Sequence, residues 1–360
     1  MSLLDDLDPR APLPTGPHAA PAPTDPLAGL VRLDEELQAQ MLGYYDKPQT
    51  RPRGRTTHVT ALDAHFKWMD GYTNLFTGWP GDGKSELLRQ LLLLEAVHAE
   101  KKSVLYVPED LPADAWYDAA VHSLTGRNPD SEVPNCLPRR WYVRAMEWVR
   151  EYFFLVQPKA GRTPAHLLDT FEAARAKLGT THHVLDPWNK LDHAGLTGAG
   201  GWQPYLVKEL GALTDWSIAT GACLSIVAHP KGQLRPRGEA RAVPDSDGVS
   251  GGQTWDDMMH TICAVYRPQK HLQRNHPAVA FYSHKLKRHA RIGCKPGSIG
   301  EGSENPDVLI DFDWHSARYC FNGVVPLAHP LASSLYADAE VIAPAPRGGI
   351  RFGPDTRPEF

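Results

Sequence analysis

The residues best suited to chemistry stand in one string, GWPGDGKS, from Gly78 to Ser85. It is a complete G-x-x-x-x-G-K-[ST] string, whose glycines allow backbone N–H groups to wrap a chain of phosphates. Lys84 is expected to reach the β and γ phosphates, and the Ser85 hydroxyl to ligate Mg²⁺. The residues predicted to hold a nucleotide here are Gly78, Gly81, Asp82, Gly83, Lys84, Ser85 and Glu86.

The segments on either side of the string support this interpretation. An apolar run at residues 72–77 precedes it, and a leucine-rich helical run at residues 86–98 follows it. The N-terminus of a helix carries positive potential and favours a bound anion. The alternative is a plain glycine-rich turn, which the strand before it and the helix after it disfavour. The sequence therefore predicts ATP or another NTP, together with Mg²⁺, as ligands.

Two acidic residues follow apolar strands further along the chain. Asp186 ends the run at residues 182–186, and Glu109 follows the short strand at residues 103–107. In P-loop proteins an acidic residue at the end of a neighbouring parallel strand holds the Mg²⁺ water shell, and Asp186 fits this position. Phosphoryl transfer also needs an oriented water, for which Glu109 supplies a carboxylate. The alternatives are a surface aspartate that starts a turn and a glutamate that caps the next helix.

A histidine stands at the end of another strand. A helix at residues 203–220 leads to an apolar run at residues 222–228, and His229 follows directly. A polar side chain at the tip of the strand beside the phosphate site is placed to sense a γ phosphate. A strand-end histidine that faces water is the alternative, and the order of the segments favours the sensor.

Strands and helices alternate along the middle of the chain. Helices are predicted at residues 112–124, 139–151 and 164–178, and further strands at residues 152–157 and 278–288. Such alternation is typical of a mainly parallel sheet with helices on its faces. We therefore predict an α/β fold with a mainly parallel twisted sheet flanked by helices.

The composition indicates where the folded core begins and ends. The 360 residues carry a net charge of −4, and both ends of the chain are rich in proline and alanine. Segments with little to bury lie outside a core. We predict a disordered tail at residues 1–28, a linker helix and basic linker at 29–55, an ATPase domain at 56–323 and a Pro-rich tail at 324–360.

Other classes of protein and site are disfavoured. The sequence has neither a run of roughly eighteen apolar residues nor a charged-then-apolar leader, which predicts a cytoplasmic protein without a membrane partner. The five cysteines are scattered without a C-x-x-C pair, and the histidines lack the spacing of metal ligands. We predict neither a zinc site nor a disulfide framework.

Six segments occur in an order that resembles one protein family. They read FTGWPGDGKS, LYVPED, VLDPWN, IVAHPKG, SGGQTWDD and KLKRHARIGCKPGS. The set is similar to the ATPase core of the DnaB-type hexameric replicative helicases, and most similar to their Twinkle-like branch. The resemblance covers residues 55–321. It implies a RecA-like P-loop NTPase fold with antiparallel strands at the C-terminal end, assembled as a homo-oligomeric ring, expected to be a hexamer, on single-stranded DNA.

The resemblance also implies roles for single residues. Glu109 matches the glutamate that polarises the attacking water, and Asp186 matches the Mg²⁺ carboxylate. His229 matches the γ-phosphate sensor. Gln253 takes the place of a polar switch residue after a Ser-Gly pair.

Contacts between subunits are implied in the same way. The late strand should supply an arginine finger to the neighbouring site, for which Arg288 is the best candidate, with Lys285 or Lys287 as the companion cation. The helix at residues 30–44 resembles the family's linker helix, which packs on a neighbouring subunit.

Two Gly- and Pro-rich stretches, at residues 192–202 and 231–252, follow the strands that carry Asp186 and His229. In a ring these loops would face the central channel, where a few cations per subunit can follow a phosphate backbone despite the negative net charge. An exposed disordered loop is the alternative. The predicted DNA contacts are Lys231, Arg235, Arg237 and Arg241.

Three functions fit this sequence. The first is an ATP-dependent, ring-forming DNA helicase that moves on single-stranded DNA and unwinds duplex. The second is a RecA-like ATPase that remodels or loads protein–DNA complexes without unwinding, and the third is a binding module whose assembly state ATP switches. A primase or a loader protein is a further predicted partner, in a bacterial or phage-encoded, nucleoid-associated setting.

Overall fold

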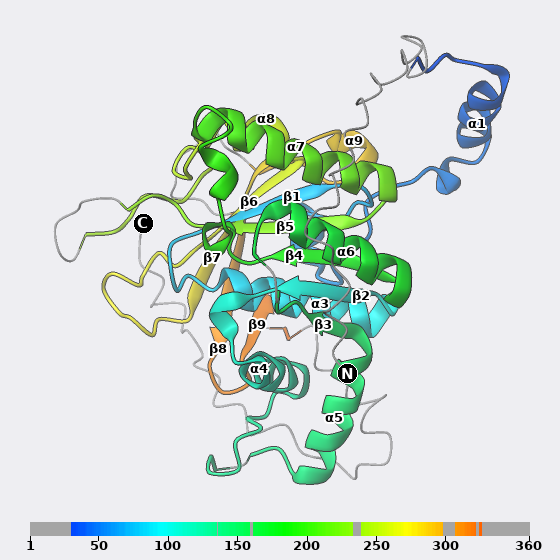
Figure 1. Cartoon of the computed structure of the whole chain (residues 1–360). Coiled ribbons are helices and arrows are strands. Elements are labelled where there is room, and N and C mark those ends of the chain that lie inside the picture. Colours follow the sequence, from blue (N-terminus) through cyan, green and yellow to red (C-terminus); the bar gives the residue numbers. More distant parts are fainter. Residues whose placement is uncertain are drawn as a thin grey trace, which may run out of the picture. The chain divides into compact units, whose positions relative to one another are not determined.

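The computed structural model describes residues 30–134, 136–158, 161–232, 239–297, 307–321 and 324–325. These residues form a nine-stranded sheet in the order β3-β2-β4-β5-β1-β6-β7-β8-β9 (Figure 1). The strands are β1 (Thr73–Thr77), β2 (Lys102–Tyr106), β3 (Phe153–Leu155), β4 (Thr180–Leu185), β5 (Cys223–Ala228), β6 (Thr261–Tyr266), β7 (Ala278–Leu286), β8 (Val308–Asp313) and β9 (Arg318–Phe321).

β1 lies in the middle of the sheet. It pairs in parallel with β5 on one side and with β6 on the other. All five of its residues are buried, because helices cover both faces of a parallel sheet. Beyond β6, the strands β7, β8 and β9 continue in antiparallel order. The predicted α/β fold, mainly parallel with antiparallel strands at its C-terminal end, is confirmed.

Helices cover the two faces of the sheet in two groups (Figure 1). One apolar core, which includes Leu91 and Trp116, joins α3, α4 and α5 to one face. A second core, with Phe171 and Leu210, joins α6, α7 and α8 to the other. The helices are α2 (Thr60–Asp63), α3 (Lys84–Ala99), α4 (Ala113–Thr125), α5 (Arg139–Tyr152), α6 (Pro164–Leu178), α7 (Trp202–Thr220), α8 (Gly252–Met258) and α9 (His289–Ile292), with 3₁₀ turns η1 (Pro48–Thr50), η2 (Pro108–Asp110), η3 (Trp188–Lys190) and η4 (Ala194–Leu196).

The chain divides into two compact units between Arg51 and Pro52. The first unit contains α1 (Glu35–Asp46), which starts later than the helix predicted at residues 30–44. The reason is a cap, since the Asp34 carboxylate accepts a hydrogen bond from the N–H of Leu37 at 2.8 Å. Several large apolar side chains of this unit are exposed, namely Leu30, Val31, Leu33, Met41, Leu42 and Tyr45.

The parallel strands bring the predicted site residues to one edge of the sheet. The phosphate loop follows β1, Glu109 follows β2, Asp186 follows β4 and His229 follows β5. Parallel strands end on the same side, and ligands of open α/β sheets bind there. We call this side the carboxyl edge, and the side where these strands begin the amino edge.

Within the described ranges, no helix is long and apolar enough to cross a bilayer. The predicted tail at residues 1–28 lies outside the described residues, as does the C-terminal tail from residue 326 onward. The predicted domain limits at residues 28, 55 and 323 stay predictions.

Candidate nucleotide site

The predicted phosphate loop connects β1 to α3 at the carboxyl edge. Gly81 and Gly83 have positive φ angles of 73° and 91°, a region where a side chain strains the backbone. A Cβ atom at Gly78 would collide with the carbonyl oxygen of Val265, and one at Gly83 with the hydroxyl of Tyr319. The glycines therefore allow a turn that packs closely against β6 and β9.

Lys84 begins α3 with a buried ammonium group. Its Nζ donates a hydrogen bond to the carbonyl oxygen of Trp79 at 3.1 Å. Burial lowers the pKa of Lys84, while the nearby carboxylates of Asp186 and Asp82 raise it. A buried lysine with such partners can exchange them for phosphate oxygens when a polyanion enters the loop.

Ser85 and Asp186 meet where the sequence predicts Mg²⁺. The Ser85 hydroxyl hydrogen-bonds to the Asp186 carboxylate, which is buried. Burial raises the pKa of Asp186 to about 7, and the hydrogen bond with Ser85 and the charge of Lys84 oppose this rise only in part. A hydroxyl beside a buried carboxylate offers the oxygen ligands that Mg²⁺ prefers. The residues present therefore fit the predicted ion.

Two more carboxylates surround this pair. Glu86 and Asp110 lie close enough to Asp186 to raise its pKa. Asp110 received no role from the sequence, although it directly follows Glu109. In the described part of the chain, no three His, Cys, Asp or Glu side chains converge on one point as a closed metal site. An ion that keeps several waters and binds phosphates needs fewer protein ligands.

Glu109 and His229 face each other across the ends of β2 and β5. The Nε2 atom of His229 lies 4.0 Å from Oε2 of Glu109. Lys190 forms an ion pair with Glu109, with 3.3 Å between its Nζ and Oε1. About half of the Glu109 side chain is exposed (48%), so water reaches this carboxylate. Lys190 in η3 was not predicted, and only its place after the VLDPWN segment was a signal.

His229 is half-buried beside the phosphate loop. Its backbone N–H donates to the side-chain oxygen of Asn189 at 3.3 Å, which ties the end of β5 to η3. Burial lowers the pKa of His229, and the positive charge of Lys84 lowers it further. A neutral imidazole near Lys84 and Glu109 is therefore the expected state at neutral pH.

Arg288 lies at the opposite, amino edge of the sheet. β7 runs antiparallel to β6, so Leu286 pairs with Thr261 at the point where β6 begins. Arg288 is also close to Tyr72, just before β1, because burial raises the pKa of Tyr72 and the charge of Arg288 opposes this. Roughly 15 Å of strand separate this edge from the phosphate loop, since β1 has five residues. Arg288 therefore does not face the phosphate loop of its own copy.

The end of β7 differs from the prediction of a strand over residues 278–288. The strand ends at Leu286, because Arg288 adopts a left-handed backbone with a φ of 54° and precedes α9. Lys287 and Arg288 are exposed, whereas Lys285 is half-buried and burial lowers its pKa. Lys287 and Arg288 are the two of these cations that a second molecule can reach.

The loop that follows β5 is anchored at its base. Pro230 and Val249 form an antiparallel bridge, and the N–H of Lys231 donates to the Gly248 carbonyl oxygen at 2.7 Å. The Lys231 side chain is exposed, as a DNA contact requires. Arg235 and Arg237, two of the predicted DNA contacts, lie outside the described residues.

Arg241 contacts the phosphate loop rather than extending into solvent. Its guanidinium lies over the Trp79 ring, 4.7 Å from the ring centroid. The Trp79 Nε1–H donates to the carbonyl oxygen of Ala242 at 2.9 Å. Trp79 is the second residue of the G-x-x-x-x-G-K-S string, so the loop after β5 touches the nucleotide loop directly.

Gln253 lies at the start of α8 and is exposed. The helix begins after Gly251, which has a positive φ of 92°. Trp255 fixes the helix from below: it is buried, and its ring meets that of Trp188 edge-on at 5.5 Å. Since Trp188 follows Asp186 closely in sequence, α8 is packed against the segment that leaves the candidate Mg²⁺ site.

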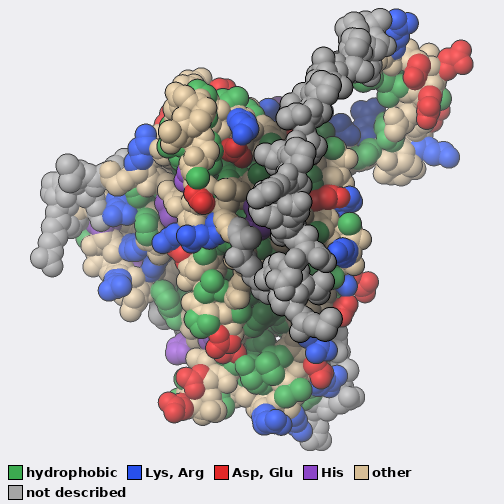
Figure 2. Space-filling view, in the orientation of Figure 1, with side chains coloured by type: hydrophobic (Ala, Val, Ile, Leu, Met, Phe, Trp, Pro, Cys, Tyr) green, Lys and Arg blue, Asp and Glu red, His purple; other side chains and the backbone are tan. Residues whose placement is uncertain are grey.

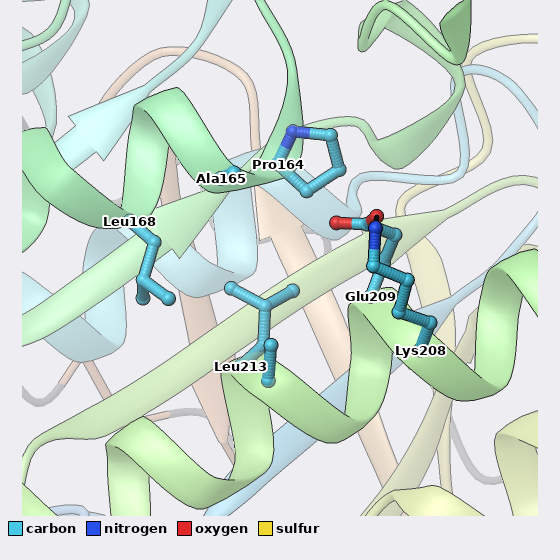
Figure 3. A pocket seen from close by; sticks show the side chains of 7 residues that line it. Pro164, Ala165, Leu168, Lys208, Glu209 and Leu213 are labelled. Carbon is cyan, nitrogen blue, oxygen red and sulfur yellow. Dashed lines mark ion pairs between the residues drawn. The ribbon is translucent and has the colours of Figure 1, made fainter. Parts of the chain in front are cut away.

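Surface features elsewhere do not point to a competing site. On the face drawn in Figure 2, Lys and Arg side chains are interspersed with Asp and Glu, and no single basic surface dominates. A cavity of about 140 Å³ lies between α6 and α7 (Figure 3). Its lining residues come from neither the phosphate loop nor the strand ends, namely Pro164, Ala165, Leu168, Lys208, Glu209, Ala212 and Leu213.

Comparisons with known proteins agree with this geometry. A comparison with models of known protein families finds no match. In sequence, the chain is similar to the Twinkle homolog protein, chloroplastic/mitochondrial, of Arabidopsis thaliana, with 24% identity over 243 residues. That match covers 60% of this chain but only 32% of the plant protein, so the chain spans about a third of the length of this relative.

In structure, the chain is similar to the solved ATPase domain of a DnaB-like helicase. The TM-score is 0.62 at 12% sequence identity, and the match covers 80% of this chain and 99% of that domain. The predicted resemblance to DnaB-type and Twinkle-like ATPase domains is therefore supported by both sequence and fold. The chain has the RecA-like P-loop NTPase fold of a DnaB-like ATPase domain.

Proposed function

We propose that this chain is an ATP-dependent, ring-forming DNA helicase that moves on single-stranded DNA. One observation carries the proposal: the phosphate loop and the cations Lys287 and Arg288 lie at opposite edges of one sheet. A complete site needs both, because phosphoryl transfer uses a loop, an ion and a cation that stabilises the transition state. A second copy is the natural source of the missing cation, and repetition of that contact closes a ring.

The residues of the carboxyl edge would divide the reaction between them. Lys84 and the loop backbone bind and orient the phosphates, and Ser85 and Asp186 hold the ion. Mg²⁺, when bound, neutralises charge on the β and γ phosphate oxygens. Glu109 accepts a hydrogen bond from the attacking water and aligns it with the γ phosphorus. His229 lies between Glu109 and Lys84, where loss of the γ phosphate changes its surroundings.

Movement on DNA would follow from the anchored loop after β5. Its base is pinned at Pro230 and Val249, next to the His229 sensor, and Lys231 is exposed there. A change at the γ phosphate is thereby close to a basic loop that several copies would present to one strand. Lys231, Arg235 and Arg237 are the proposed contacts with the phosphate backbone.

The test combines turnover, mass and strand separation. ATPase rates are measured with and without single-stranded DNA, and the mass of the assembly is measured with and without an ATP analogue. We expect DNA to raise turnover, the analogue to favour a ring, and a forked duplex to be unwound. Lys84→Ala should abolish turnover, whereas Lys177→Ala, which removes an exposed lysine from α6, should leave it unchanged.

Other outcomes select other functions. ATP turnover without unwinding of a forked duplex would favour an ATPase that remodels or loads protein–DNA complexes. Turnover near zero with saturating DNA, together with assembly driven by nucleotide, would favour an ATP-switched module. A chain that stays monomeric with ATP and DNA would rule out the ring.

A further inference from the structure

A second lysine reaches the phosphate loop from outside the G-x-x-x-x-G-K-S string. Lys270 lies in the connection between β6 and β7, 188 residues from Asp82 along the chain. Its Nζ donates to Oδ1 of Asp82 at 2.9 Å and to the carbonyl oxygen of Pro80 at 2.6 Å. The Asp82 side chain is almost fully buried (2% exposed), whereas 30% of the Lys270 side chain is exposed.

The same connection holds the loop at a second point. Nη1 of Arg267 donates to the Gly81 carbonyl oxygen at 3.3 Å, and the backbone of Arg267 hydrogen-bonds to the Asp82 carboxylate. Nη2 of Arg267 is held by the carbonyl oxygens of Arg274 and His276, at 2.7 and 3.0 Å. The middle of the phosphate loop is therefore fixed to an ordered segment rather than to solvent.

Asp82 places negative charge inside a site that must receive a polyanion. A carboxylate there repels phosphates unless a cation compensates it, and the repulsion is strong where water is excluded. Burial raises the pKa of Asp82, while the hydrogen bond and the charge of Lys270 oppose this rise. Lys84 also lies near Asp82, but its ammonium group is the one that the phosphates require.

We propose that Lys270 is a positioning residue of the nucleotide site: it neutralises Asp82 and keeps the turn of the phosphate loop in the shape that receives the triphosphate. Lys270 acts through Asp82 and Pro80, and does not itself contact the phosphates. The inference rests on the proposed function, because it assumes that the loop binds a nucleotide.

The experiment is a double-mutant cycle on the full chain. The Kd of a fluorescent, non-hydrolysable ATP analogue with Mg²⁺ is measured without DNA, for the wild type, Lys270→Ala, Asp82→Asn and the double variant. Lys270→Ala should weaken binding about tenfold or more, because it leaves a buried carboxylate facing the analogue. In the Asp82→Asn background the same change should cost less than about twofold, since no charge is left to neutralise.

Two further variants separate this role from a general effect on folding. Lys270→Arg keeps the cation and should bind the analogue within about threefold of the wild type. Arg274→Ala removes an exposed cation from the same connection and should leave the Kd unchanged. Thermal melting of each variant shows that the binding losses are measured on folded protein.

The outcomes are distinct. A loss from Lys270→Ala that persists in the Asp82→Asn background would mean that Lys270 contacts the nucleotide directly, which overturns the inference but not the proposed function. Wild-type affinity in Lys270→Ala overturns it as well. No binding of the analogue by the wild-type chain would overturn both.

Discussion

Two buried carboxylates at opposite edges of the sheet have opposite electrostatics. At the carboxyl edge, burial raises the pKa of Asp186 to about 7, above its ordinary value. Near the amino edge, Glu95 in the last turns of α3 is equally enclosed, with 1% of its side chain exposed. Burial alone would raise its pKa too, yet hydrogen bonds with His182 and His58 and the charge of Arg55 hold it well below its usual range.

The difference lies in the partners of the two carboxylates. Glu95 has Arg55 at 3.3 Å, His182 at 3.1 Å and His58 at 3.3 Å, which join three separate segments of the chain. Asp186 has Ser85 and Lys84 on one side and more acidic groups on the other. A buried acid with a full set of donors holds a fold together, whereas one short of positive charge marks a place for a cationic ligand. The amino edge is therefore built as a frame, and the carboxyl edge as a site.

The largest expected effect tests whether the two edges of different copies meet. Arg288→Ala should lower ATP turnover about a thousandfold and keep analogue binding, because the finger acts only on the transition state. Mixing Arg288→Ala with Lys84→Ala should restore part of the turnover, since one mixed interface pairs an intact loop with an intact Arg288. Turnover of each variant and of mixtures at several ratios is the measurement.

A matched control is Arg291→Ala, which removes an exposed cation of α9 close to Arg288 and should keep turnover. Mixtures as inactive as the separate variants would mean that no site is shared between copies. If Lys287→Ala were inactive and Arg288→Ala active, the finger would be Lys287.

The second prediction concerns the acid at the carboxyl edge. Asp186→Asn should lower turnover about a hundredfold or more, because it removes charge that holds the ion. The same change should stabilise the nucleotide-free protein by about 1 kcal/mol or more, because an uncompensated buried charge is lost. Urea unfolding without nucleotide, beside ATPase rates, gives both quantities.

Asp215→Asn serves as the control, since it neutralises an exposed aspartate of α7 and should change neither turnover nor stability. If Asp186→Asn destabilised the empty protein, Asp186 would be part of the frame, and the contrast with Glu95 would be lost.

Sequence reasoning reached the carboxyl edge more easily than the frame, for a physical reason. Parallel strands deliver the residues that follow them to one edge, so strand ends located along the chain already place the loop, Glu109, Asp186 and His229. The helix predicted at residues 164–178 has those bounds in the structure as α6. Where a local backbone angle or cap decides, as at Arg288 and Asp34, the predicted ends of elements were wrong.

Contacts between distant segments could not be predicted in this way. Glu95 reads as one polar residue in a leucine-rich helix, and its partners Arg55 and His182 lie 40 and 87 residues away along the chain. Lys270 is separated from Asp82 by 188 residues and belongs to no motif. Pairing of this kind depends on three-dimensional packing, and no local pattern records it.

The third prediction tests the frame by pH. Glu95→Gln should lower the free energy of unfolding at pH 7 by about 3 kcal/mol, because it leaves buried cationic partners unpaired. The folded pKa of Glu95 lies below the unfolded value, so its contribution is complete above the unfolded pKa and is lost as pH falls toward the folded one. The gap between the variant and the wild type should therefore narrow below about pH 4.

Urea unfolding at a series of pH values measures this gap. Glu147→Gln, which changes an exposed glutamate of α5, should follow the wild type throughout. A gap that is constant with pH would show that Glu95 supports the fold through packing and not through its charge.

The smallest expected effect concerns the boundary between site and channel, where Arg241 covers Trp79. If Arg241 supports the phosphate loop, Arg241→Ala should weaken analogue binding by about 1 kcal/mol, the size of a partly buried cation–π contact, and leave DNA affinity nearly unchanged. Lys231→Ala should do the reverse, because its exposed cation contacts no part of the nucleotide loop and would bind phosphates of the strand. Analogue Kd values and DNA binding at two salt concentrations separate the two residues. A reduced salt dependence in Arg241→Ala would return Arg241 to the DNA contacts and extend the site into the channel.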